Sequence, residues 1–241
     1  MQSGVPLRAA IRSTSSWSSC RSSSRSTSAR SSGRCASTTA TRRTQRRAFV
    51  LEHGGWRALP RPPAARAAAG AAMVGGRLYV VGGVTGSKLA RTMLVFDLRS
   101  GRWSTAKGPD PRAYLGVTAV QGGLVAVGGR TSGLDTATSR AEMYVARARR
   151  WRVLPPAPEA LSEGAAAKVG NLVVTLGGYS DSFWGDESVY AFNVRSREWS
   201  RLPDLPHYGG SLAAAALGAH LYALAATAME LGRRHRASAS S

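Results

Sequence analysis

The feature that most constrains this chain is a tryptophan that recurs at a nearly constant interval, at Trp56, Trp103, Trp151 and Trp199. Pairs of adjacent glycines at 82–83, 128–129 and 177–178 precede the last three tryptophans, again at nearly equal intervals. A period held across these landmarks indicates one supersecondary unit repeated along the chain. We therefore expect a single array of similar units rather than several independent cores.

Each period contains four short apolar or alternating runs separated by turn residues. The best-preserved unit reads AAAGAAMV, LYVVGG, TMLVFDL and RWSTAK between Ala67 and Lys107, with tight turns at GGR and RSG. Four strands joined in this way form an antiparallel meander, which becomes a propeller blade when it is repeated radially. The sequence thus predicts an all-β propeller with complete four-stranded blades at about 67–107, 113–155 and 163–203.

The array ends in an incomplete unit on each side, within a propeller region predicted to span 48–226. Residues 48–60 match the last two strands of a unit, and residues 209–226 match the first two. These half-blades are complementary and could pair to close a four-bladed ring. The alternative is an incomplete propeller whose open blade edges are prone to self-association. The broken pattern at both flanks favours the incomplete propeller.

The repeat resembles the kelch motif (kelch type 1) over roughly residues 48–226. The resemblance rests on the double glycine after the second strand, the tryptophan of the fourth strand and the Leu-Pro step in WRALP, WRVLPP and WSRLP. Arg66 and Arg112, which stand at the same distance before their glycine pairs, and Tyr79 add to it. It implies a kelch-type propeller of the galactose oxidase-like superfamily, with protein binding as a frequent role. We also expect the tryptophan ring to lie on the flat backbone of the glycine pair.

Both flanking segments lack the composition of a folded core. Residues 1–47 hold 14 serines, ten arginines and no acid, and are predicted to be disordered. Residues 227–241 are predicted to be a disordered basic tail. These flanks carry more than half of the net charge of +20, and the rest is arginine scattered through turns. No specific nucleic-acid binding is therefore expected.

The sequence contains no clear signal peptide and no apolar run long enough to span a membrane. The compartment is unknown, with the cytoplasm as the default, although residues 1–47 resemble an organellar transit peptide in composition. Cys20 and Cys35 are the two cysteines, and both lie outside the repeats. No disulfide or metal site is therefore expected within the array.

The residues of known enzymatic propellers are largely unmatched. A galactose-oxidase-like copper centre needs a cysteine, which the repeats lack; an iron-binding triplet and a sialidase-like aspartate box are also not found. A carbohydrate-active, sialic-acid mutarotase-like activity remains an alternative, because Arg66, Arg112 and Glu163 could lie near the propeller channel. Roles in turns or on the surface are simpler interpretations of these three residues. We predict no catalytic residue, no metal ligand and no cofactor.

The remaining candidate site is the face formed by the loops after the second strand and before the first strand of each unit. In kelch propellers these loops emerge on the same side, and aromatic and arginine residues are typical of interaction hot spots. The expected function is a non-catalytic scaffold that binds an unidentified protein partner through this face. The predicted binding residues are Arg112, Tyr114, Arg130, Tyr179, Trp184 and Tyr208, with Phe183 and His207 on the same loops.

A third interpretation is a non-functional frameshifted fragment of a larger kelch protein. Ala225 and Ala226 stand where the period requires two glycines. With suitable codons, AATAMELGRRHRA read one base earlier becomes GGYGNGAWASSPR, which restores the pair and is similar to GGYSDSFWGDES at 177–188. For residues 1–47 as well as residues 225–241, the sequence does not tell whether the native reading frame is used. Sequencing the coding DNA tests it, and the hypothesis fails if no frame near codon 225 encodes a glycine pair.

Overall fold

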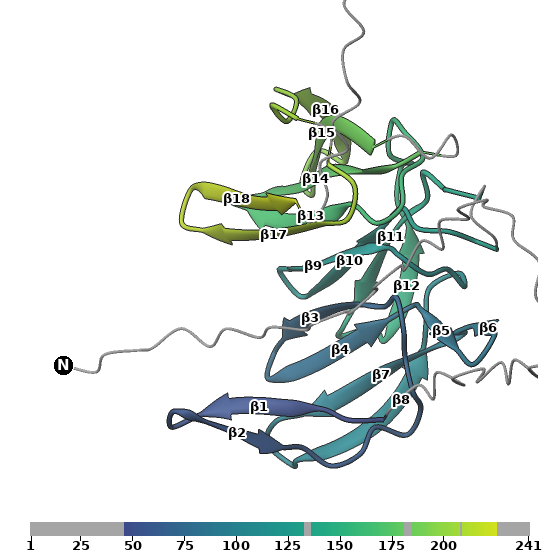
Figure 1. The fold of residues 1–241 in the computed structure, drawn as a ribbon, viewed down its shortest axis with the longest axis vertical. Coiled ribbons are helices and arrows are strands. Elements are labelled where there is room, and N and C mark those ends of the chain that lie inside the picture. Colours follow the sequence, from purple (N-terminus) through teal and green to yellow (C-terminus); the bar gives the residue numbers. More distant parts are fainter. Residues whose placement is uncertain (1–45, 133–135, 181–184, 208, 226–241) are drawn as a thin grey trace, which may run out of the picture.

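The computed structural model describes residues 46–132, 136–180, 185–207 and 209–225 (Figure 1). Every regular element in these residues is a β-strand, and all strand pairs are antiparallel. No helix among them is long and apolar enough to cross a membrane. The predicted disorder of 1–47 and 227–241 falls almost wholly outside the described residues.

Blade 1 is a four-stranded sheet in the order β3-β4-β7-β8. Its strands are β3 (Gly70–Val74), β4 (Arg77–Val81), β7 (Thr92–Asp97) and β8 (Arg102–Lys107). The connection from β4 to β7, predicted as a polar loop, forms a small hairpin of β5 (Val84–Thr85) and β6 (Lys88–Leu89).

Blades 2 and 3 repeat this order, with β12-β11-β10-β9 in one sheet and β13-β14-β15-β16 in the other. Blade 2 contains β9 (Gly116–Val120), β10 (Gly123–Val127), β11 (Ala141–Val145) and β12 (Arg150–Val153). Blade 3 contains β13 (Ala165–Val169), β14 (Leu172–Tyr179), β15 (Gly185–Asn193) and β16 (Glu198–Leu202). The predicted all-β fold of three complete blades is thus confirmed.

Each end of the array carries a two-stranded half-blade. These sheets are β1 (Phe49–Glu52) with β2 (Gly55–Ala58), and β17 (Leu212–Leu217) with β18 (His220–Ala225). The two half-blades are separate sheets at opposite ends of the described array (Figure 1). The hydrogen-bonded pairing that would make a fourth blade from them is not formed between the described residues.

The first strands of successive units lie next to one another along the inner side of the array. Strand β3 contacts β9, β9 contacts β13, and β13 contacts β17. The remaining strands of each unit follow outward, so the sheets fan out from the line of first strands (Figure 1). This arrangement is typical of propeller blades around an axis.

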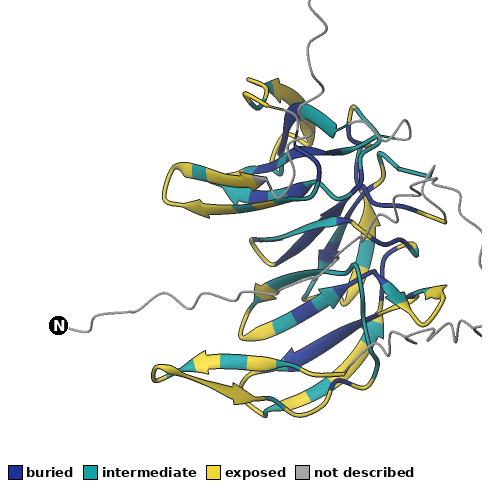
Figure 2. Ribbon diagram, viewed as in Figure 1, coloured by how far each residue is buried: buried dark blue, intermediate teal, exposed yellow. Residues whose placement is uncertain are grey.

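The apolar core lies between neighbouring sheets. One cluster joins blades 1 and 2 through Met93, Leu124 and Tyr144, and a second joins blades 2 and 3 through Val125 and Phe192. A third cluster packs blade 3 against the last half-blade. Burial is greatest in the middle of the array and falls towards β1–β2 and β17–β18, which are largely exposed (Figure 2). The interblade contacts therefore supply the main apolar burial of the fold.

The glycine pairs lie where neighbouring backbones approach most closely. All six glycines have positive φ, between 53° and 114°. A Cβ on Gly128 would overlap the carbonyl oxygen of Leu161, and one on Gly129 would lie 2.6 Å from that of Ala113. Only glycine fits such positions without displacing the backbone. Each pair is thus held between the loop before its own blade and the loop before the next.

The tryptophans link each blade to the preceding one. The indole Nε1 of Trp103, Trp151 and Trp199 donates to a backbone carbonyl 43 or 44 residues earlier, at distances of 2.8, 2.9 and 3.0 Å. The acceptors are Pro60, Lys107 and Pro155, each at or just after the last strand of the preceding unit.

The expectation that the tryptophan ring lies on the backbone of the glycine pair is wrong. Each tryptophan ring packs instead on the aromatic residue directly opposite on the third strand, with ring centroids 5.0–5.4 Å apart. The partners are Phe96, Tyr144 and Phe192. The nearest neighbours of the glycines are backbone carbonyls and small or aliphatic side chains, so the two landmarks serve separate interblade contacts.

Gly128→Ala should destabilise the array far more than Gly122→Ala. Both glycines have similar φ, 65° and 73°, but a Cβ at Gly122 meets nothing within 4 Å. The control therefore suffers only the left-handed strain of about 1–2 kcal/mol, a shift in melting temperature of roughly 2–8 °C. Gly128→Ala adds the carbonyl overlap, and thermal unfolding followed by circular dichroism measures the difference. Equal melting temperatures would show that the close approach carries no energy.

Trp151→Phe should lower the free energy of unfolding by about 0.5–1.5 kcal/mol, because it removes the bond to Lys107 while an aromatic ring stays opposite Tyr144. Trp56→Phe is the matched control, since Trp56 is 60% exposed in the first half-blade. Urea unfolding measures both variants. The interblade role of the indole is contradicted if the two variants unfold alike.

Candidate functional site

The loops after the second strand and before the first strand meet on one side of each blade, as predicted. Isolated antiparallel bridges join Ala67 to Val84, Ala113 to Arg130 and Ser162 to Tyr179. Each bridge has two backbone hydrogen bonds of 2.7–3.1 Å. The residue after each glycine pair is thereby fixed beside the start of its own blade. We call this side the loop face.

A line of backbone hydrogen bonds crosses the loop face from blade to blade. Ala68, Tyr114 and Glu163 occupy the same position of successive units, and all three have left-handed φ, of 53°, 58° and 62°. The Tyr114 amide donates to the Ala68 carbonyl at 2.8 Å, and the Glu163 amide donates to the Tyr114 carbonyl at 2.9 Å. Non-glycine residues adopt this conformation only when their surroundings impose it. The loop face is therefore a backbone surface of defined shape.

Two predicted binding residues are accessible on this face. Tyr114 is 44% exposed, and its backbone belongs to the line of hydrogen bonds just described. Tyr179 is half-buried, and a Cβ placed on Gly210 would overlap its hydroxyl oxygen. Its ring therefore lies against the Gly210 backbone in the loop before the last half-blade. His207, on the same loop, is exposed.

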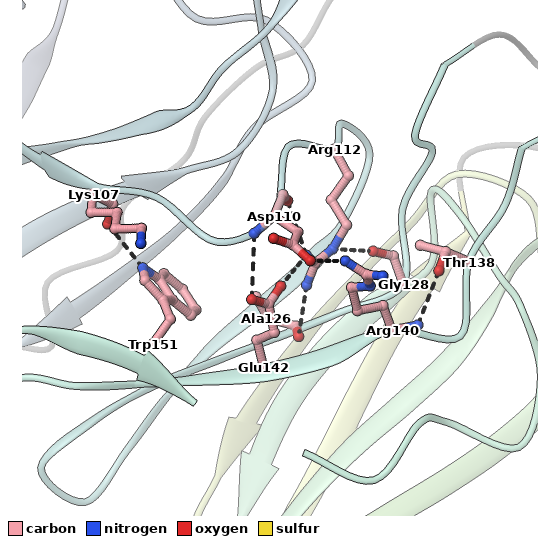
Figure 3. A network of polar contacts seen from close by, with 9 residues as sticks. All are labelled: Lys107, Asp110, Arg112, Ala126, Gly128, Thr138, Arg140, Glu142 and Trp151. Carbon is pink, nitrogen blue, oxygen red and sulfur yellow. Dashed lines mark hydrogen bonds and ion pairs between the residues drawn. The ribbon is translucent and has the colours of Figure 1, made fainter. Parts of the chain in front are cut away.

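Arg112 is fully buried and belongs to the interior of blade 2 (Figure 3). Its Nε donates to the Gly128 carbonyl at 2.8 Å, Nη1 to the Asp110 carbonyl at 3.1 Å and Nη2 to the Ala126 carbonyl at 3.3 Å. Nη1 also pairs with the carboxylate of Glu142, which is 4% exposed. The guanidinium thus ties the loop before β9 to β10 and β11, so the expectation that it reaches the accessible face is wrong.

Arg66 occupies the corresponding place in blade 1 and has a similar role. Its guanidinium bonds to the Thr85 hydroxyl and to the Thr92 carbonyl, the latter at 2.7 Å. Partial burial lowers the pKa of Arg66 from its usual value. The two arginines shared with the kelch motif therefore act as internal clamps of their own blades.

The remaining residues predicted for a site are buried, hydrogen-bonded within the array or outside the described residues. Arg130, directly after the second glycine pair, is buried, with 3% exposed. Trp184 and Tyr208 lie outside the described residues, as does Phe183. Glu163 accepts a hydrogen bond of 2.8 Å from the Ser211 hydroxyl. The described loop face thus brings together Tyr114, Tyr179 and His207 as exposed or half-buried side chains.

A small cavity of about 30 Å³ lies beneath Tyr114 between blades 2 and 3. Inside it the Tyr190 hydroxyl donates to the Glu159 carboxylate at 2.7 Å. Burial raises the pKa of Tyr190, and Glu159 raises it further. This volume suits about one water molecule rather than a ligand. No group of three or more metal-ligating side chains occurs among the described residues.

Sequence reasoning missed Glu142 and the left-handed position at Ala68, Tyr114 and Glu163. A signal for Glu142 was present, because it is an acid in the buried strand AEMYV and so needs a buried cation. The left-handed position had no comparable signal, since alanine, tyrosine and glutamate occupy it in turn.

The Kelch motif matches residues 65–109 and 111–158, which contain blades 1 and 2. The chain contains kelch repeats. Blade 3 lies outside these matches but has the same strand order, glycine pair and tryptophan bond. The predicted family is thereby confirmed, and kelch-repeat proteins are generally protein-interaction scaffolds.

Curated relatives support this assignment. The chain is 31% identical over 144 residues to Kelch domain-containing protein 8B of Mus musculus, covering 54% of this chain and 40% of that protein. It is 30% identical over 123 residues to Kelch repeat-containing protein kel-10 of Caenorhabditis elegans, with 49% and 21% covered. F-box protein AFR of Arabidopsis thaliana is 29% identical over 153 residues, with 60% and 40% covered. The matched part therefore spans less than half the length of each relative.

Arg112→Met should lower the free energy of unfolding by about 3–5 kcal/mol, because it leaves the buried Glu142 carboxylate without its cation. Arg112→Met combined with Glu142→Met should recover part of this loss, since both charges are then absent. Arg201→Met is the surface control: it breaks an ion pair with Asp204 whose side chains are 57% and 38% exposed, and should leave unfolding almost unchanged. Denaturant titration separates these outcomes, and a double variant as unstable as Arg112→Met would contradict a buried charge pair.

Proposed function

We propose that this kelch-repeat protein is a non-catalytic scaffold that binds a protein partner through the loop face. The main observation behind this proposal is the exposure of Tyr114 on a fixed backbone. Its side chain is 44% exposed although its backbone is held by hydrogen bonds to the blades on both sides. A large aromatic side chain on a fixed backbone loses little conformational entropy on binding, which is typical of interaction hot spots.

Tyr179 supports the same proposal from the neighbouring blade. Its ring lies against Gly210, and its backbone is paired with Ser162, so its position is defined by two further segments. Tyrosine presents an apolar ring together with a hydroxyl donor, and therefore suits a partner surface of mixed polarity. We infer that Tyr114 and Tyr179 form the centre of the binding surface, with His207 at its edge. Arg112 and Arg130 are left out because their side chains are buried.

The carbohydrate-active alternative has no observation in its favour. Arg112 is occupied by Glu142 and three backbone carbonyls, Arg66 by threonine oxygens, and Glu163 by Ser211. A mutarotation assay on sialic acid by NMR is expected to show no rate above buffer. Measurable turnover would overturn the non-catalytic proposal.

Self-association through the half-blades is a second proposal, carried by their exposed apolar residues. Tyr222 and Leu224 on β18 are 58% and 74% exposed, and Phe49 on β1 is 54% exposed. Strand β18 is the second strand of a unit and β1 is the third, so the two edges are complementary between copies. Leu224→Lys should increase the monomer fraction in light scattering at fixed concentration. Exposed Val153→Lys in blade 2 is the control, and an equal effect of both would contradict pairing through these edges.

Tyr114→Asn tests the loop face, because asparagine tolerates left-handed φ while the aromatic ring is lost. Leu98→Asn is the matched control, since Leu98 is 46% exposed in the turn after β7 on the opposite side. Partners captured by the unchanged chain should be lost with Tyr114→Asn and kept with Leu98→Asn. For a purified partner we expect a weakening of roughly 30-fold or more, as for a hot-spot residue. Equal binding by both variants would remove Tyr114 from the interface.

A further inference from the structure

A cavity of about 270 Å³ lies between blades 1 and 2, on the side opposite the loop face. One wall comes from β4, β7 and β8 of blade 1, and the other from β11 and the turn before β12 of blade 2. The loop-face residues Tyr114 and Tyr179 do not line it. Whatever binds here is therefore independent of the scaffold function proposed above.

The floor of this cavity is aromatic. Tyr79 of β4 and Tyr144 of β11 are 4% and 3% exposed, and their ring centroids lie 5.7 Å apart. Burial raises the pKa of Tyr144 and Tyr79 adds to this, whereas the nearby Arg149 and Arg77 act in the opposite direction. The Tyr144 hydroxyl therefore stays protonated at neutral pH and can donate a hydrogen bond.

The rim of the cavity carries an excess of positive charge. Arg77, Arg147 and Arg149 line it, and Asp97 is the one acid among the described lining residues. Asp97 is already engaged, since its Oδ2 accepts from the Arg77 Nε at 2.9 Å and its Oδ1 accepts from the Ser100 amide at 2.9 Å. The lining therefore has a formal charge of +2 in a partly enclosed space.

Arg149 is held in place by its backbone. It has a φ of 51°, and its amide donates to the Ala146 carbonyl at 3.3 Å within the turn between β11 and β12. On the facing wall, the Ser104 hydroxyl of β8 already donates to the Val95 carbonyl at 3.5 Å, so the available donor there is the Arg77 guanidinium. Guanidinium and hydroxyl donors around a small cavity are the groups that recognise a phosphate.

We propose that this cavity binds the phosphate dianion of a phosphomonoester. The charge of the lining equals that of the dianion in magnitude, and the volume admits a phosphoryl group with a few attached atoms. The Arg147–Arg149 turn and the Tyr144 hydroxyl supply donors from blade 2, and the Arg77 guanidinium supplies donors from blade 1. The bound group thus bridges the two blades.

Blade 3 offers a matched comparison within the same chain. Arg195 and Arg197 occupy in blade 3 the positions that Arg147 and Arg149 have in blade 2, and Arg197 has the same left-handed conformation, with φ of 64°. The positions facing them on blade 2 that correspond to Arg77, Tyr79 and Asp97 are Gly123, Val125 and Val145. Arg152 stands on this facing wall at the position of Ser104, and Phe192 replaces Tyr144. This second turn therefore has the same charge and backbone but lacks both tyrosine hydroxyls.

The experiment measures binding of inorganic phosphate, O-phosphoserine and a phosphodiester dinucleotide to the full chain by calorimetry at constant ionic strength. Three proteins are compared: the unchanged chain, Arg147→Gln with Arg149→Gln, and Arg195→Gln with Arg197→Gln. We expect the first double variant to weaken monoester or phosphate binding more than tenfold, and the second to change it less than twofold. Tyr144→Phe should weaken it severalfold, because the ring is kept while one donor is lost. Thermal unfolding of each variant checks that the fold persists.

Each outcome of this experiment either supports or overturns the proposed phosphate site. Tighter binding of O-phosphoserine than of inorganic phosphate supports a phosphomonoester site, whereas the reverse order assigns the cavity to the free ion and overturns the proposal. Equal losses in the two double variants would mean that the +20 chain attracts anions generally, which overturns the proposal. Binding of the dinucleotide as tight as that of the monoester, or no binding of any probe, overturns it as well.

Discussion

The array depends on backbone hydrogen bonds that cross between blades at the glycine pairs. The second glycine of each pair donates to the loop before the following blade, as Gly83 does to Arg112 and Gly129 to Leu161, both at 2.9 Å. Because both partners are backbone groups, the sheets must approach until a Cβ would overlap a carbonyl oxygen. This distance positions the apolar clusters between the sheets and the side chains at the interblade surfaces.

The sequence predicts the blades well because their determinants are local and repeated. Turn glycines, alternating strands and the period of the tryptophans need no knowledge of distant contacts. The partner of each tryptophan could not be predicted in the same way. The acceptors at Pro60, Lys107 and Pro155 are backbone carbonyls, which any residue supplies, so nothing in the residue types marks them.

The candidate site could be predicted only in part, because loop composition does not tell an inward side chain from an outward one. Arg112 and Tyr114 are close neighbours in the sequence, yet Arg112 is fully buried and Tyr114 is 44% exposed. The difference comes from Glu142, which lies 30 residues further along the chain than Arg112. The cavity at Arg149 could not be predicted for a similar reason: its walls belong to two blades, and its donors come from a turn that repeats in blade 3 without the same neighbours.

The tryptophan bond also bears on how such arrays change in length. Every complete unit carries an indole donor in its fourth strand, and blades 1 and 2 also supply the carbonyl acceptor used by the next unit. A tandem duplication of one of these units would therefore bring a donor and an acceptor together, and the new blade would meet compatible neighbours on both sides. Gain or loss of whole units then keeps every one of these bonds paired, whereas an insertion of part of a unit would leave one of them without its partner.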